Sequence, residues 1–135
     1  MTVDREEAAM AVHLNHTIVE ANDRDLTADF LVDLLGLAPA AMYGPFRVVE
    51  LSNDVSLDVI QAVGAVHSQH YAFLVSEAEF DEIWDRIKQR RLDFWADPFH
   101  HRRGQINTND GGRGLYWDDP SGHILEIITR PYGSG

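Results

Sequence analysis

The sequence predicts an α+β fold in which two βαβββ modules form curled mixed sheets around a shared cleft. Three observations support this prediction: an order of strand and helix patterns that occurs twice, a helix at a matching place in each half, and polar residues that interrupt apolar strands at matching places. We expect the 135 residues to form a single domain, with module one at about 12–61 and module two at about 69–130.

Module one opens with a predicted strand and continues into a predicted helix. In residues 12–20 apolar and polar side chains alternate with a period of roughly two residues, as in a strand with one buried face. Asp23 or Asp25 can cap the start of the helix, and Gly36 can end it. Residues 42–61 look like short strands separated by turn sequences. The apolar residues at helical spacing are Leu26, Phe30, Leu34 and Leu37.

Module two repeats this order. Residues 69–75 predict a strand, and Ser76 to Leu92 predict an amphipathic helix, because Ser76 followed by Glu79 is typical of a capping box. The remaining strands are expected at about 93–97, 114–118 and 123–130, with His123 in a solvent-exposed turn. With His16 aligned on His70, Leu26 falls on Phe80 without a gap, which favours a duplication.

Composition and charge exclude several classes of function. The chain has no cysteine, so disulfides and thiolate metal sites are excluded. Its 22 acidic and 11 basic residues give a formal charge of −11, which disfavours binding to nucleic acid and to a membrane surface. No apolar run is long enough to span a membrane, and the acidic amino terminus does not look like a targeting peptide. We therefore expect a cytoplasmic protein.

Four polar residues occupy strand positions whose same-face neighbours are apolar: His16, Asp58, His70 and Glu126. A carboxylate on an apolar face is costly unless it is paired, hydrogen-bonded or bound to metal. Each residue alone is better explained by a partner on a helix or by a strand that faces solvent. However, the histidines lie in the first strands of the two modules and the carboxylates lie in the last strands. Pseudo-twofold packing of the modules would therefore bring all four residues to one metal-binding cleft. Imidazole and carboxylate suit one divalent ion of Fe, Mn, Ni, Co or Zn, with positions left open for substrate.

These residues resemble the vicinal oxygen chelate superfamily, which includes glyoxalase I, fosfomycin-resistance enzymes, bleomycin-resistance proteins and extradiol dioxygenases. The resemblance runs from LNHTIVEANDRDLTADFLVDLLGL to GGRGLYWDDPSGHILEIITRPYG, and its closing segment is specific. It implies that His16, His70 and Glu126 are the metal ligands and that Asp58 lies near the position of a fourth. It also implies a homodimer, in which the halves of the two chains are sometimes exchanged.

The resemblance leaves the branch of chemistry open. Tyr116 precedes Glu126 by ten residues, as in the extradiol dioxygenases, and its phenol could hold a substrate oxygen. That branch places a histidine seven to nine residues before the tyrosine, where this chain has Asn107, Thr108 and Asn109. A lyase or isomerase would instead use Asp58 as ligand or base. A third reading is a metal-free drug-binding protein of the bleomycin-resistance type.

Five further residues are candidates for contact with a small-molecule substrate. Asn107 and Asn109 could orient an oxygen, and Arg113 could bind a carboxylate or pair with a neighbouring aspartate. Trp95 and Phe99 could form an apolar wall beside the long loop from Pro98 to Gly112, or could simply contribute to packing.

Overall fold

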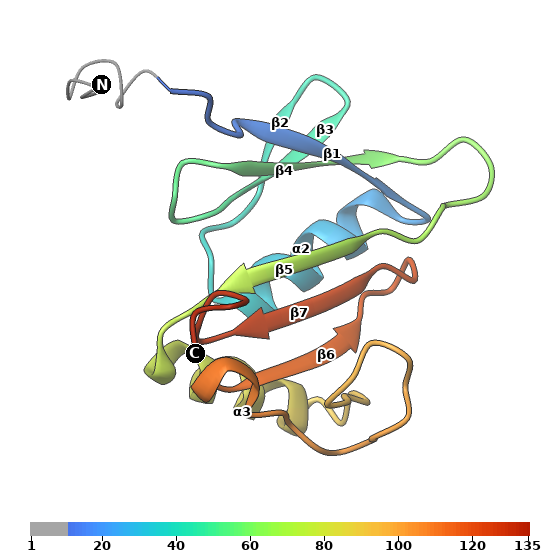
Figure 1. The fold of residues 1–135 in the computed structure, drawn as a ribbon. Coiled ribbons are helices and arrows are strands. Elements are labelled where there is room, and N and C mark those ends of the chain that lie inside the picture. Colours follow the sequence, from blue (N-terminus) through green and yellow to red (C-terminus); the bar gives the residue numbers. More distant parts are fainter. Residues whose placement is uncertain (1–10) are drawn as a thin grey trace.

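The computed structural model describes residues 11–135, which form two mixed sheets that do not close on each other (Figure 1). The first sheet has the order β1-β4-β3-β2, and the second has the order β5-β7-β6. In both sheets the first strand of the module pairs in parallel with the last strand, and the other pairs are antiparallel. The strands are β1 (His16–Ala21), β2 (Ala41–Tyr43), β3 (Phe46–Glu50), β4 (Ser56–Gln61), β5 (His70–Leu74), β6 (Gly114–Asp118) and β7 (Ile124–Ile128). This confirms the predicted α+β class and the order of its modules.

Helix α2 (Arg24–Leu35) forms where the sequence predicts it. The side chain of Asp23 accepts a hydrogen bond from the Leu26 amide at 3.0 Å, and Gly36 ends the helix in the left-handed conformation at φ 69°. The apolar residues at helical spacing are not all buried, because Leu26 is 54% exposed whereas Leu34 is fully buried. The helix rotates Leu26 toward solvent and buries the small residues Thr27 and Ala28 beside Leu31 and Val32.

Helix α3 (Glu77–Gln89) begins with the predicted capping box. The hydroxyl of Ser76 accepts from the Glu79 amide at 3.1 Å, while the Glu79 carboxylate accepts from the Ser76 amide at 3.2 Å. Phe80, Ile83 and Ile87 form its buried stripe. The helix is therefore specified locally at its start and by packing along its length.

One shared core joins the two modules. In every strand that contributes to it, the buried apolar residues carry odd numbers: Val19, Ala21, Val49, Leu57, Val59, Leu115, Trp117, Leu125 and Ile127. Because strand side chains alternate, the even-numbered residues of these strands face away from this core. The four proposed metal-site residues all have even numbers, so they lie on the opposite faces of the sheets.

Module two differs from module one after its helix. The strand expected at 93–97 is present only as isolated bridges from Trp95 to Arg103 and to Tyr116. The following loop is held by the Asp97 carboxylate, which accepts from the backbone amides of Phe99, His101 and Arg102. These backbone bonds stabilise a compact loop in place of a strand, and a short 3-10 helix, η1 (Asn109–Gly111), precedes β6.

The turn before β7 connects the two modules through hydrogen bonds. The prediction that His123 is exposed to solvent in this turn is wrong, because His123 is 1% exposed. Its Nε2 donates to the Glu20 carbonyl at 2.7 Å, and its Nδ1 accepts from the Gln69 amide at 3.0 Å. The hydroxyl of Ser121 bonds the Asn22 amide and the Thr27 hydroxyl, both at 3.0 Å. A turn of module two thereby satisfies backbone groups of module one.

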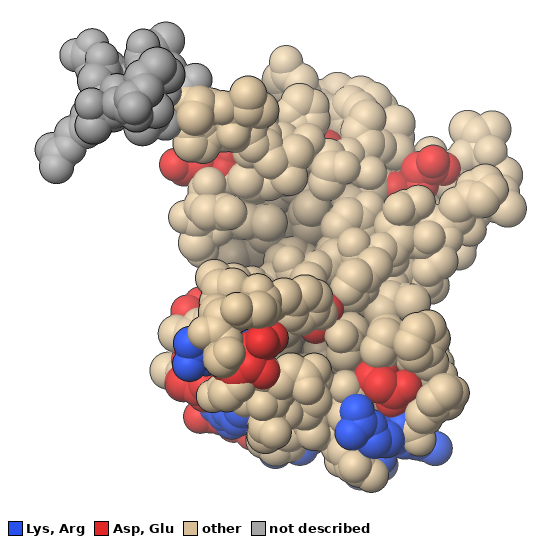
Figure 2. Space-filling view, in the orientation of Figure 1, with Lys and Arg blue, Asp and Glu red and all other residues tan. Residues whose placement is uncertain are grey.

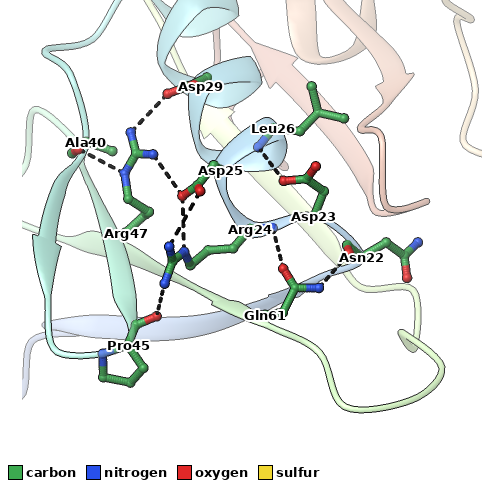
Figure 3. A network of polar contacts seen from close by, with 10 residues as sticks. All are labelled: Asn22, Asp23, Arg24, Asp25, Leu26, Asp29, Ala40, Pro45, Arg47 and Gln61. Atoms are coloured by element: carbon green, nitrogen blue, oxygen red, sulfur yellow. Dashed lines mark hydrogen bonds and ion pairs between the residues drawn. The ribbon is translucent and has the colours of Figure 1, made fainter.

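Ion pairs reinforce module one at its surface (Figure 3). Arg47 lies 3.0 Å from both Asp25 and Asp29, and Arg24 pairs with Asp25 at 3.1 Å.

Much of the face seen in Figure 2 is free of charged side chains, and a hollow lies between its upper and lower parts. Among residues 11–135 no helix has the length and apolar character needed to cross a membrane.

Candidate metal centre

The centre of the candidate site is a buried carboxylate. Glu126 is 1% exposed, although it lies on the outer face of the second sheet. The register of β7 places it between Ala72 of β5 and Tyr116 of β6. Its Oε1 lies 2.9 Å from Nε2 of His70. The structure therefore brings together two of the three predicted metal ligands.

The surroundings of His70 favour a cation between its ring and Glu126. Nδ1 lies 3.1 Å from the carbonyl oxygen of Ile124, and Nε2 faces the carboxylate of Glu126. A neutral imidazole has a single N–H and can satisfy only one of these acceptors. A metal bound at Nε2 would satisfy the carboxylate and leave Nδ1–H for the carbonyl, which is the usual support of a metal-binding histidine. The 2.9 Å separation also suits two ligands at right angles, each about 2.1 Å from a metal.

Tyr116 lies beside this pair, as the sequence predicted. Its ring stacks on that of His70, with 5.9 Å between centroids and 27° between planes. Burial is the main cause that raises the pKa of Tyr116, and hydrogen bonding to Tyr132 and the nearby Glu126 carboxylate raise it further. The phenol therefore keeps its proton and is suited to donate a hydrogen bond.

Tyr132 also contacts Glu126 and was not predicted from the sequence. Its hydroxyl donates to Oε2 of Glu126 at 2.5 Å and lies 3.2 Å from the hydroxyl of Tyr116. Burial and the bond to Glu126 raise the pKa of Tyr132. This residue follows Pro131, outside any strand, so no periodicity pointed to it; an aromatic residue soon after the carboxylate was the one available signal.

The remaining two polar strand residues lie in the first sheet. His16 is exposed, and its Nδ1 is 2.7 Å from the side-chain oxygen of Asn15. Asp58 is half-buried and accepts from the hydroxyl of Ser56 at 2.8 Å. The register of β1 and β4 puts both on the outer face of that sheet. Residues 11–135 contain no cluster of three or more His, Cys, Asp or Glu side chains that could hold a metal ion within one chain.

The asparagines predicted to contact substrate are used by the fold. Asn107 is buried; its amide nitrogen donates to the Ala96 carbonyl at 2.9 Å, and its side-chain oxygen accepts from the Asn109 amide at 3.2 Å. Its backbone also pairs with Gly114, where a Cβ would come within 2.9 Å of the Asn107 side chain. Asn109 is exposed at the start of η1. Asn107 thus fixes the start of β6.

Arg113 is engaged on the side of the sheet that faces α3. Its guanidinium lies 2.7 Å from Glu77 and 2.8 Å from Asp81, and it covers the ring of Phe80 at 4.4 Å. The sequence left open whether this arginine binds a substrate or pairs with Asp118 or Asp119. The structure pairs it with helix α3 instead.

The two aromatic candidates differ in their surroundings. Trp95 is 9% exposed, its backbone exchanges hydrogen bonds with Tyr116, and its ring stacks on His100 at 3.7 Å. Phe99 is 75% exposed on the loop. Trp95 therefore supports the strand that carries Tyr116, whereas Phe99 lies free on the surface.

Two modules, each with a helix and with its first and last strands paired in parallel, define the class of fold, and comparison with known proteins identifies the family. The chain belongs to the Glyoxalase/Bleomycin resistance protein/Dioxygenase superfamily, which matches residues 13–127. This confirms the resemblance noted in the sequence.

Relatives and solved structures are similar over most of the chain. The metallothiol transferase FosB of Shouchella clausii (strain KSM-K16) is 35% identical over 125 residues, which span 86% of this chain and 79% of the relative. The glutathione transferase FosA of Serratia marcescens is 28% identical over 125 residues, which span 87% of this chain and 81% of the relative. The solved structure of the oxidase ChaP-H2 has 60% identity and a TM-score of 0.91, and covers 93% of this chain and 99% of its own. The solved structure of the oxidase ChaP-H1 has 65% identity and a TM-score of 0.90, and covers 91% of this chain and 99% of its own.

Proposed function

We propose that this protein is a metal-dependent oxidase that acts on a small molecule with two neighbouring oxygen atoms, with dioxygen as the oxidant. The observation that carries the proposal is the buried Glu126 facing His70, with the ring of Tyr116 stacked on His70. The oxidases ChaP-H1 and ChaP-H2 are much more similar to this chain than the transferases are, which favours oxidation over group transfer.

The proposed ligands are His16, His70 and Glu126, with His16 supplied by a second copy of the chain. Strands β1 and β5 are each paired on one side only within the part of the chain that the structure describes. An open groove of about 860 Å³ separates them. Their outer faces carry exposed apolar side chains that a partner would cover, namely Leu14, Ile18 and Leu74. Edge strands with an apolar outer face are suited to pairing with another chain.

Each residue then has a defined task. A bound divalent metal supplies Lewis-acid chemistry and, when it is iron, redox chemistry as well. Tyr116, whose ring stacks on His70, would donate a hydrogen bond to a substrate oxygen. Asp58 shares its face with His16, so it would reach the site from the same sheet of the second copy, as base or further ligand.

The metal site is tested by elemental analysis of protein purified without chelator, beside a Glu126→Gln variant. We expect about one equivalent of metal per chain, lost in Glu126→Gln, because the amide lacks the charge of the ligand. Glu82→Gln, at an exposed position of helix α3, is the matched control and should keep the metal. Absence of metal from the wild-type protein, even after addition of Fe²⁺ or Mn²⁺, would favour the metal-free binding protein instead.

The shared site is tested by mixing His16→Ala with Glu126→Gln. Neither homodimer has a complete site, but a mixed dimer joins the intact His16 of one copy to the His70 and Glu126 of the other. After unfolding and refolding together, random pairing restores about a quarter of the wild-type sites. Mixtures that bind no more metal than the separate variants would contradict a site shared between chains.

The reaction class is tested with the iron-loaded protein in an oxygen electrode. Aromatic compounds with two adjacent hydroxyl groups are the probes, because they present neighbouring oxygens. We expect oxygen uptake that depends on both metal and probe, and a lower rate at unchanged metal content in Tyr116→Phe. Metal binding without oxygen uptake across the panel would move the assignment to the non-redox branch.

A further inference from the structure

The segment after β7 folds back onto the metal centre. Tyr132 is 62% exposed, yet its hydroxyl points inward and bonds Oε2 of the buried Glu126 at 2.5 Å. His70 faces the other oxygen, Oε1, at 2.9 Å. The two oxygens of one carboxylate therefore have different partners, one on each side.

Several contacts fix this segment in place. The Gly133 amide donates to the carboxylate of Asp110 at 3.1 Å, which ties the segment to η1. Arg130 donates to the Ser134 carbonyl at 2.6 Å, and the Ser134 amide bonds the Pro131 carbonyl at 3.2 Å. Tyr132 is thus held at Glu126 by a folded turn with its own hydrogen bonds.

We propose that Tyr132 is a positioning residue that occupies Oε2 of Glu126, so that Glu126 binds the metal through Oε1 alone. The inference rests on the metal site proposed above. A carboxylate can bind a metal through one oxygen or through both. A second bond from Glu126 would fill a position that a substrate with two neighbouring oxygens needs. By holding Oε2, Tyr132 would keep that position open.

The test compares Tyr132→Phe with the wild-type protein, using Mn²⁺ as the probe. The water-proton relaxation caused by bound Mn²⁺ reports how many exchangeable waters occupy its open positions. We expect Tyr132→Phe to bind one equivalent of Mn²⁺ and to lower the relaxivity by about a third, since Glu126 then closes onto the ion and displaces one water. A chain ending at Pro131 should give the same lowered value.

Tyr43→Phe is the matched control, because it removes a phenol hydroxyl from an exposed residue on β2. It should change neither Mn²⁺ binding nor relaxivity. Equal relaxivity in Tyr132→Phe and wild type, with Mn²⁺ bound by both, would overturn the role of Tyr132 and leave the metal site standing. Loss of Mn²⁺ from a folded Tyr132→Phe would also overturn it, since Tyr132 would then control affinity. No binding by the wild-type protein would overturn the metal site itself, and the inference with it.

Discussion

The two modules share a topology but prepare their halves of the proposed site to different degrees. In module two, Glu126 is buried and contacts both His70 and Tyr132. In module one, His16 is exposed and Asp58 accepts a hydrogen bond from the neighbouring Ser56. Module two thus holds its two proposed ligands in a fixed arrangement, and module one presents its proposed ligands on an open face. The difference teaches that two halves of the same topology can surround their polar residues very differently.

Truncation of a core side chain should lower the free energy of unfolding more than any other change considered, and it tests whether the two modules unfold together. Phe80→Ala in module two should cost about 3–5 kcal/mol, and Leu31→Ala in module one about 2–5 kcal/mol, because each leaves a cavity in the same core. All three tryptophans, Trp84, Trp95 and Trp117, belong to module two. Urea unfolding should therefore give coincident tryptophan-fluorescence and circular-dichroism curves in both variants. Separate transitions would show that the modules unfold independently.

Loss of the contact between modules should have the next largest effect. His123→Phe keeps a ring of similar size but leaves the Gln69 amide and the Glu20 carbonyl without their partner, at about 1–3 kcal/mol. The urea midpoint measures the loss. The exposed His67 provides the control, and His67→Phe should leave the midpoint unchanged. An unchanged midpoint in both variants would mean that the turn does not hold the modules together.

The comparison of ligands predicts unequal losses of metal affinity. His70→Ala should weaken Mn²⁺ binding about tenfold more than His16→Ala, because His70 is already aligned on Glu126 whereas His16 must be brought in by a second chain. Calorimetric titration of both variants under one set of conditions measures the ratio. Equal losses would indicate that module one is as well organised as module two in the protein that binds metal.

The smallest effect concerns the surface ion pairs of both modules. Hydrogen bonds from Arg24 and then Arg47 lower the pKa of Asp25 in module one, and bonds from Thr129 and then Arg113 lower that of Glu77 in module two. A lowered pKa stabilises the fold above the carboxylate's ordinary pKa of about 4, and this stability is lost as pH falls through the folded-state value. Arg47→Met and Arg113→Met should thus lower the melting temperature slightly at neutral pH and less in acid. A difference that grows in acid would contradict this sign.

The sequence predicted the parts of the fold that depend on local signals. The Asp23 cap, the Ser76–Glu79 capping box and the left-handed Gly36 are all decided within a few residues, and all three are confirmed. The strand expected at 93–97 is reduced to isolated bridges, because the Asp97 carboxylate accepts hydrogen bonds from backbone amides of the loop that follows it. That competition depends on how the loop folds, which alternation does not reveal.

The sequence predicted part of the arrangement of the candidate site but not how its two halves meet. Strand alternation placed His70 and Glu126 on one face, and the structure brings them together. It does not bring His16 to them within residues 11–135, because the modules share the faces with odd-numbered residues instead. Periodicity shows which residues share a face but not which faces meet. Tyr132 was missed for a similar reason, since only the turn after Pro131 directs it to Glu126.

The connection between the modules has a consequence for the ancestry of the chain. Residues 62–69 leave the first sheet and enter the second without a helix or strand, and most of them are exposed. What unites the halves is the common core and the buried ring of His123. The residues of this stretch therefore contribute little to the packing between the modules. The matching topology of the halves is what doubling of a shorter gene would give, and their order along the chain could be reversed without interrupting a helix or strand.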